Sequence, residues 1–73
     1  MQDHKNKIEA ILFTTGRFLT LDEIGRFAGI GSIGFIKQVL GELSDSYSKR
    51  ETALEIINDE KSRWKLNIRK EYL

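Results

Sequence analysis

The chain has 73 residues, of which 40% are hydrophobic and 32% charged, a composition typical of one small soluble globular domain. The 12 basic and 11 acidic residues leave a net charge of +1, which argues against a dedicated nucleic-acid binder because such proteins usually carry a clear basic excess. There is no cysteine, so neither disulfides nor a thiolate metal site can stabilise the fold. The core must do so alone, although a domain of this size buries only roughly 60% of the surface that its unfolded chain exposes. The longest strongly apolar run, residues 10–13, is too short to span a membrane, and the first residues do not read as a signal peptide. We therefore expect a cytoplasmic protein.

The first part of the chain predicts two helices joined by a short corner. Residues 3–15 form the first, because apolar side chains recur there at helical spacing and Gly16 is a residue type that commonly follows a helix end. Residues 21–28 form the second, which ends at Gly29 or Gly31. The side chains expected in the core are Ile8, Ile11, Leu12 and Thr15, followed by Leu21, Ile24, Phe27 and Ala28.

The start of the second helix carries two independent signals. Thr20 occupies the N-cap position and Glu23 follows three residues later, so each side chain can accept a hydrogen bond from the backbone of the other residue in a capping box. Leu19 and Ile24 have the spacing of a hydrophobic staple across the same helix end. Together these signals fix the angle between the first two helices.

A third and longer helix is predicted over residues 33–50, with Ser32 as its N-cap. Its apolar positions recur three and four residues apart and define a core stripe of Ile33, Ile36, Val39, Leu40, Leu43 and Tyr47. At about 100° per residue, the opposite face of this helix carries Gly34, Gln38, Gly41, Glu42, Asp45, Ser48 and Lys49.

The periodicity then changes to the alternation typical of strands. Leu54 and Ile56 flank a glutamate, and Trp64, Leu66 and Ile68 alternate with polar residues, with the turn-forming residues 58–62 between the two runs. This pattern predicts a β-hairpin whose apolar face packs on the helices, because an isolated hairpin is only marginally stable. Three helices followed by a two-stranded hairpin define an α+β fold, the winged helix, with residues 1–73 as a single domain.

A winged helix that reads DNA does so through its third helix, but the predicted outer face of that helix suits this task poorly. It carries two acids and one base near its far end, whereas attraction to phosphates dominates affinity for DNA. Gln38 alone is a weak signal for reading a base. Inside a helix, Gly34 and Gly41 each lower the stability by roughly 0.5–1 kcal/mol relative to alanine. They are either tolerated or they form a smooth strip that a partner approaches closely.

The predicted wing makes the better case for nucleic acid. Arg63, Lys65 and Arg69 share the strand face opposite the apolar side chains, and Lys61 lies nearby. These four residues are candidates for weak contacts with a DNA backbone, which carry no sequence preference. The alternative is a solvated strand face on which Glu55 is a cross-strand partner of Lys65.

Several apolar side chains have no clear place in the predicted core. Phe13 lies about 140° from the centre of the core face of its helix, Phe35 lies at the edge of its stripe, and Ile57 falls on the outward side of its strand. Phe18 lies in the corner between the first two helices. They are either buried through local bends or they mark a protein interface. The interface candidates are Phe13, Phe18, Gly34, Phe35, Gly41 and Ile57.

The sequence predicts no catalytic, cofactor or metal site. His4 is the only histidine and lies near the start of the chain. Adjacent acids such as Asp22 and Glu23 do not converge on one helix face, and no glycine-rich segment both follows a strand and opens a helix as a phosphate loop would. We therefore expect a protein that is not an enzyme.

The order and spacing of several motifs resemble one known family over nearly the whole chain. Residues 8–13 read I-E-A-I-L-F, and residues 19–24 read L-T-L-D-E-I after Gly16. Leu40, Leu43 and Tyr47 then follow an L-x-x-L-x-x-x-Y pattern, and the hairpin is followed by a basic residue and an aromatic one. These motifs resemble segregation and condensation protein B (ScpB), although that family usually has G-E-P where this chain has G-R-F.

The resemblance implies the N-terminal half of a protein with two tandem winged helices. ScpB-like proteins are non-catalytic subunits of the prokaryotic condensin, the SMC–ScpA–ScpB complex, which acts in chromosome condensation and segregation during the cell cycle. They dimerise, largely through the N-terminal domain, and associate with the kleisin subunit ScpA, which bridges the heads of the SMC ATPase. On this resemblance we expect a homodimer with a kleisin partner, associated with the nucleoid. The short apolar run and the nearly neutral outer face of the third helix lead us to expect no membrane contact and at most weak, non-specific DNA binding.

Two alternatives remain open at this point. One is a winged-helix transcription regulator that binds DNA through the third helix and the wing. The other is a structural fragment with no binding activity of its own.

Overall fold

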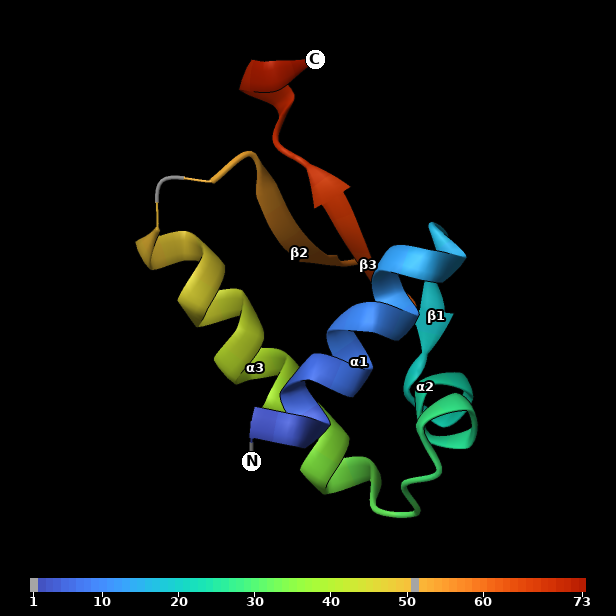
Figure 1. Ribbon diagram of the computed structural model, residues 1–73. Coiled ribbons are helices and arrows are strands. Elements are labelled where there is room, and N and C mark those ends of the chain that lie inside the picture. The colour runs from blue at the N-terminus through green and yellow to red at the C-terminus, as the bar shows by residue number, and fades with distance from the viewer. Residues whose placement is uncertain (1, 51) are drawn as a thin grey trace.

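The computed structural model describes residues 2–50 and 52–73 and has the predicted winged-helix fold. In Figure 1, α1 passes in front of the N-terminal half of α3, α2 lies at the right, and the wing formed by β2 and β3 stands above them. The elements are α1 (Gln2–Thr15), β1 (Leu19–Thr20), α2 (Leu21–Ala28), α3 (Ile33–Lys49), β2 (Leu54–Asn58), β3 (Arg63–Ile68) and the 3₁₀ helix η1 (Lys70–Tyr72).

The core is formed by one face of each helix and is closed by the wing. Ile8 and Leu12 of α1, Ile24 of α2, and Ile36 and Leu40 of α3 are completely buried. Their helical spacing confirms the predicted core stripes. The partly buried side chains that pack against this core are Ile11, Leu21, Ile30, Phe35, Ile56, Trp64 and Leu66.

The capping box at the start of α2 forms as predicted. The backbone N–H of Glu23 donates to Thr20 Oγ1 at 3.1 Å, and the backbone N–H of Thr20 donates to Glu23 Oε1 at 3.0 Å. Leu19 and Ile24, the residues of the predicted staple, are both completely buried. At the other end, Gly29 rather than Gly31 terminates the helix, with a φ of +72° that glycine adopts without steric cost.

The sheet has three strands rather than the two that the sequence predicted. The third is β1, which pairs antiparallel with β3 so that Leu19 faces Trp64 and Thr20 faces Arg63. A two-residue strand has no alternation by which it could be recognised in the sequence. It ties the corner before α2 directly to the wing.

The register of the hairpin corrects one predicted pair. Glu55 faces Asn67 in β3, and Asn67 Nδ2 donates to Glu55 Oε2 at 3.3 Å. Lys65 faces Ile57 instead, so the predicted cross-strand pair of Glu55 and Lys65 is wrong.

Three side chains that were predicted in the core are exposed. Phe27 is 54% exposed because α2 turns Gly25 toward α3, where a Cβ would lie 2.9 Å from Ile36 Cδ1. Ile33 is 44% and Ile68 45% exposed, since they stand at the first position of α3 and the last of β3, beyond the ends of the core. The third helix also stops at residue 49, one residue earlier than expected.

Candidate protein-interaction site

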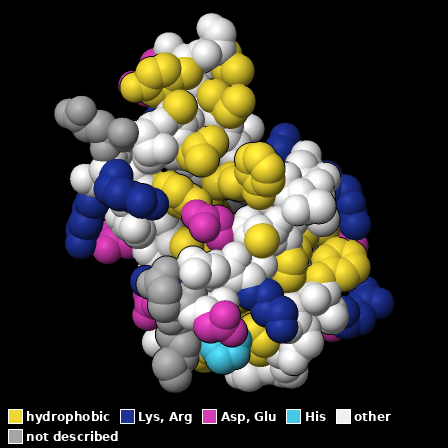
Figure 2. Space-filling view, viewed as in Figure 1, with side chains coloured by type: hydrophobic (Ala, Val, Ile, Leu, Met, Phe, Trp, Pro, Cys, Tyr) yellow, Lys and Arg dark blue, Asp and Glu magenta, His cyan; other side chains and the backbone are white. Residues whose placement is uncertain are grey.

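Phe13 projects outward from α1 with 73% of its surface exposed, as its helical phase predicted. The residue before it, Leu12, is completely buried. One step along a helix turns the side chain by about 100°, so burial of Leu12 directs Phe13 toward solvent. In Figure 2, hydrophobic side chains form a band from the C-terminal end of the chain across the wing to the middle of this face.

An apolar groove separates Phe13 from the wing. It consists of a hollow of about 340 Å³ and an adjoining one of about 230 Å³ that share Phe13, Leu54 and Leu66. We call it the wing groove. Its other lining residues are Asn6, Glu9, Ala10, Tyr47, Lys65, Asn67, Ile68 and Leu73.

A second apolar hollow, of about 370 Å³, lies on the other side of α1, against α2. We call it the helix groove, and it is lined by Lys7, Ala10, Ile11, Thr14, Thr15 and Phe27. Ala10 lines both grooves, so the exposed side of α1 is a ridge between two hollows with a small side chain at its middle. Exposed apolar surface gathered in this way is typical of protein contact sites.

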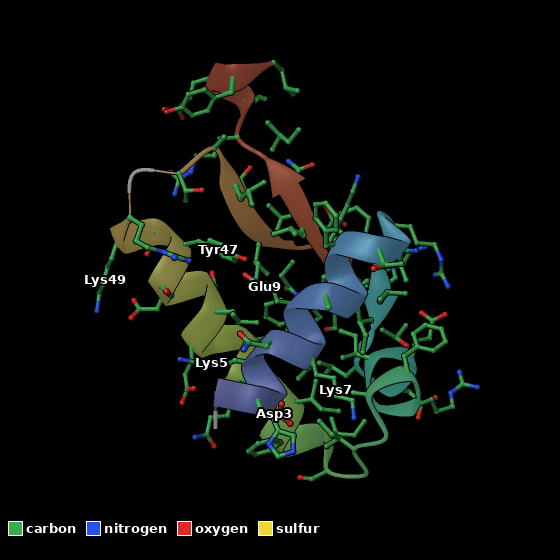
Figure 3. All side chains as sticks on the ribbon, viewed as in Figure 1. Asp3, Lys5, Lys7, Glu9, Tyr47 and Lys49 are labelled. Carbon is green, nitrogen blue, oxygen red and sulfur yellow. The ribbon has the colours of Figure 1, made fainter. Side chains whose placement is uncertain are left out.

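Glu9 and Tyr47 join α1 to α3 within the wing groove (Figure 3). The Tyr47 hydroxyl donates a hydrogen bond to Glu9 Oε2. Burial of the tyrosine, together with the hydrogen bond to a carboxylate, raises the pKa of Tyr47 to about 12. The guanidinium of Arg50 lies 5.2 Å from the centre of the same ring.

Two of the four cations predicted to contact DNA, Arg63 and Arg69, bond to other groups of the domain. Arg69 Nη2 donates to the carbonyl of Tyr47 at 2.9 Å, and Arg69 Nε donates to the carbonyl of Leu54 at 3.2 Å. Arg63 forms an ion pair of 2.7 Å with Asp59. Partial burial alone would raise the pKa of Asp59, but hydrogen bonds from the backbone and side chain of Arg63 lower it below its ordinary value.

The other two cations are Lys61, which is exposed in the turn of the wing, and Lys65. Lys65 Nζ lies 5.7 Å and the Arg63 guanidinium 5.5 Å from the centre of the Phe18 ring. Phe18 is therefore a half-buried cation–π partner of the wing. Of the four cations, Arg63 alone has a carboxylate partner among the described ion pairs, while Arg69 and Lys65 contact neutral groups of the domain.

The outer face of α3 is exposed at every position that the sequence assigned to it. Its charges are paired: Lys49 Nζ lies 3.0 Å from Asp45 Oδ2, and Lys5 Nζ of α1 lies 3.7 Å from Glu42 Oε1. Gly34 and Gly41 belong to this face, and a Cβ on either one would meet no atom within 4 Å. Packing within the domain therefore does not require glycine at these two positions.

The remaining interface candidates are partly buried. Phe35 packs against the core, with its ring edge-on to that of His4 at 5.1 Å between centroids. His4 thus lies within α1 and contacts α3. Ile57 is half-buried in β2. Of the six candidates, Phe13, Gly34 and Gly41 are exposed, whereas Phe18, Phe35 and Ile57 contribute to the domain's own packing or sheet.

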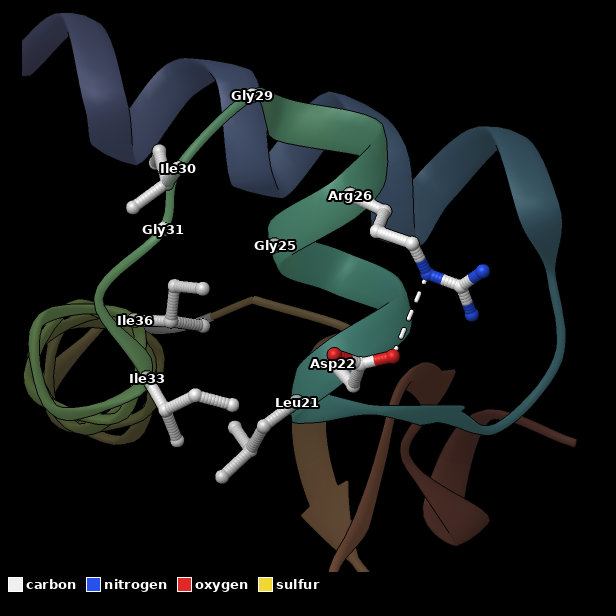
Figure 4. A pocket seen from close by; sticks show the side chains of 9 residues that line it. All are labelled: Leu21, Asp22, Gly25, Arg26, Gly29, Ile30, Gly31, Ile33 and Ile36. Carbon is white, nitrogen blue, oxygen red and sulfur yellow. Dashed lines mark ion pairs between the residues drawn. The ribbon is translucent and has the colours of Figure 1, made fainter.

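A further hollow lies between α2 and the start of α3, and no sequence pattern predicted it. It has a volume of about 320 Å³, and the side chains of Leu21 and Ile33 point toward one another at its mouth (Figure 4). An ion pair of 3.3 Å between Asp22 and Arg26 flanks it. Helical periodicity could predict neither this hollow nor the exposure of Phe27, because both depend on how α2 is rotated against α3.

Among the described residues there is no group of histidine and acidic side chains that could hold a metal ion. A search of the same residues finds no helix with the length and apolarity that crossing a membrane requires. The molecule is a winged-helix protein in which the charges on the outer face of α3 are paired and α1 carries an exposed apolar surface.

The family model of the segregation and condensation complex subunit ScpB matches residues 6–73, and the chain belongs to this family. No curated protein matches it.

Proposed function

We propose that this domain is a non-catalytic part of the condensin subunit, in which it forms a homodimer and associates with the kleisin subunit ScpA. On this proposal it corresponds to the first of two tandem winged helices. It acts in the cytoplasm at the nucleoid, in chromosome condensation and segregation, and is linked to the SMC ATPase through the kleisin.

The exposed ridge of α1 is the observation that carries this proposal. Phe13 at 73% exposure lies between two apolar grooves on a domain of only 73 residues. Binding energy in protein interfaces is concentrated in a few aromatic anchors surrounded by contacts that exclude water. Phe13 has the size and setting of such an anchor.

The competing function, a DNA-binding transcription regulator, fits the charges less well. The charges on the outer face of α3 are paired within the domain, and Arg63 and Arg69 of the wing are bonded to groups of the domain itself. A phosphate backbone would have to compete with these partners, and electrostatic attraction to phosphates is the main source of affinity for DNA.

The experiment that separates the two functions is a pair of titrations of this chain. One adds a kleisin fragment of the complex and the other adds duplex DNA, with the mass of the resulting species measured in each. We expect a complex with the kleisin fragment and no sequence-selective DNA complex at about 150 mM salt. Selective DNA binding without any kleisin complex would overturn the proposal.

A further inference from the structure

We propose that a hollow between the end of α3 and η1 binds one nucleotide unit of a single-stranded nucleic acid, with the phosphate on two arginines and the base on a tyrosine. The hollow has a volume of about 310 Å³, and we call it the arginine hollow. Its lining residues are Arg50, Thr52, Arg69, Glu71 and Tyr72. None of these five lines either groove beside α1, so the inference does not depend on the proposed protein contacts.

Tyr47, near the end of α3, holds both arginines in place. Arg69 Nη2 donates to the Tyr47 carbonyl at 2.9 Å, and Arg69 Nε donates to the carbonyl of Leu54 at 3.2 Å. The guanidinium of Arg50 lies 5.2 Å from the centre of the Tyr47 ring. Two guanidinium groups from distant parts of the chain are thus fixed beside one hollow. A side chain that is already held loses little conformational freedom when it binds an anion.

Hydrogen-bond donors remain available at the arginine hollow. The bonds of Arg69 to the two carbonyls use Nε and Nη2, and no hydrogen bond from its Nη1 is found among the residues that the structure describes. The bond to Tyr47 stabilises the end of α3, because a cation offsets the partial negative charge of a helix C-terminus, but this role leaves Nη1 for a ligand. The Thr52 hydroxyl accepts from the backbone N–H of Leu54 at 3.3 Å, and its own proton can still be donated.

The charge of the arginine hollow suits a phosphodiester. Neither Arg50 nor Arg69 has a carboxylate partner among the ion pairs of the described residues. Glu71, which is exposed, is the acid in the described lining, so two arginines and one glutamate leave a single positive charge there. A backbone phosphate carries a single negative charge, and the planar donor groups of arginine match its oxygens.

Tyr72 provides an aromatic surface at the same hollow. Its side chain is 60% exposed and belongs to η1, directly beyond the wing. Bases of a single strand stack on exposed aromatic rings while cations hold the backbone. In a duplex the bases are paired and stacked on one another, so their faces cannot reach Tyr72. The combination of two arginines and one tyrosine therefore favours a single strand over a duplex.

Fluorescence anisotropy with a labelled oligothymidylate of about 12 nucleotides tests the site. At about 50 mM salt we expect Arg50→Gln and Tyr72→Leu each to raise the dissociation constant at least about fivefold. Tyr72→Phe keeps the ring, so its dissociation constant should stay within about twofold of the original value. Glu71→Gln removes the opposing charge and should tighten binding about twofold to threefold.

Lys37→Gln is the matched control, because Lys37 is an exposed cation of α3 without an ion pair among the described residues. It should change the dissociation constant by less than about twofold. A gain of affinity cannot arise from misfolding, so Glu71→Gln keeps the test valid if another variant is destabilised. If Lys37→Gln weakens binding as much as Arg50→Gln, or if Glu71→Gln brings no gain, the arginine hollow is not the binding site.

Three competitors of the labelled strand identify the ligand: duplex of the same length, thymidine monophosphate and polyglutamate. Unlabelled oligothymidylate should displace the label at least about fivefold more effectively than any of them, because it presents about 12 overlapping nucleotide units with unpaired bases. Equal competition by thymidine monophosphate would assign the hollow to a free nucleotide, and equal competition by duplex or polyglutamate would show that charge alone is recognised. Either result, or no binding of the oligothymidylate up to millimolar protein, would overturn the inference.

Discussion

The hydroxyl of Tyr47 donates a hydrogen bond to the carboxylate of Glu9, and this contact joins α3 to α1 within the wing groove. Tyr47 is 4% exposed and also accepts, through its backbone carbonyl, a hydrogen bond from Arg69. One residue therefore holds together the first helix, the third helix and the end of the wing, which together shape the groove beside Phe13.

The raised pKa of Tyr47 predicts a loss of stability at alkaline pH. The unfolded chain releases the phenolic proton near pH 10, whereas the folded domain holds it until about pH 12. Stability from this contact is complete below pH 10 and is lost as the pH rises through this window. Tyr47→Phe should remove this part of the pH dependence, as measured by unfolding followed through Trp64 fluorescence between pH 8 and pH 12.

Tyr72 supplies the matched control for this measurement, because it is the other tyrosine and is 60% exposed in η1. Tyr72→Phe should leave the alkaline unfolding profile unchanged. If both variants shift the profile equally, the Tyr47–Glu9 contact does not control alkaline stability.

The reciprocal hydrogen bonds of Thr20 and Glu23 predict non-additive mutational effects. Thr20→Ala should lower the free energy of unfolding by about 1 kcal/mol, because it removes the N-cap. Glu23→Ala in the Thr20→Ala background should cost less than it does alone, since the two side chains act as one capping box. Urea denaturation of both single variants and the double variant measures this. Full additivity would mean that the box contributes nothing as a unit.

Phe13 should affect association rather than folding. We expect Phe13→Ala to weaken association by about 2 kcal/mol or more, and to change the free energy of unfolding by no more than about 0.5 kcal/mol. Leu12→Ala, at the neighbouring buried position, should instead cost about 2–5 kcal/mol of stability. Thermal melts of dilute protein and sedimentation of concentrated protein separate the two effects. A large stability loss in Phe13→Ala would show that this side chain belongs to the core.

DNA binding should be weak, independent of sequence and steeply dependent on salt. Of the four wing cations, Lys61, Lys65 and Arg69 have no ion pair among the described contacts, and Arg69 is held by the carbonyls of Tyr47 and Leu54, so few phosphates can be neutralised. Fluorescence anisotropy with labelled duplex should show affinity that collapses between about 50 and 200 mM salt. The Lys61→Ala and Lys65→Ala variants should each lower the salt slope by about one. Sub-micromolar, sequence-selective binding at about 150 mM salt would favour the regulator function instead.

The helices could be predicted from the sequence because their information is local. The recurrence of Ile8 and Leu12, the cap at Thr20 and the stripe through Leu40 each depend on residues within a few positions of one another. The hairpin was predicted for the same reason, from alternation in two adjacent runs. The exposure of Ile68 at the end of the hairpin was not predicted, because alternation does not show where the supporting helices stop.

The parts that could not be predicted depend on contacts between distant segments. Strand β1 exists because Leu19 meets Trp64, which lies far along the chain. Phe27 is exposed because α2 is rotated to fit Gly25 against α3, a choice made by tertiary packing.

The candidate site shows the same division between local and distant information. Phe13 could be identified from its helical phase alone, and its exposure agrees with that prediction. The sequence could not show that Arg63 pairs with Asp59 or that Arg69 bonds to the carbonyl of Tyr47. A strand pattern predicts the face on which a side chain lies but not its partner. For the same reason the two apolar grooves beside α1 appear only in three dimensions.

Sedimentation equilibrium of the unmodified chain, alone and with a kleisin fragment, tests most directly whether this domain works by protein contact. We expect a dimer at micromolar concentration or above and a larger complex when the kleisin fragment is added, with both species reduced in Phe13→Ala. A chain that remains strictly monomeric at high concentration and also ignores the kleisin fragment would contradict it.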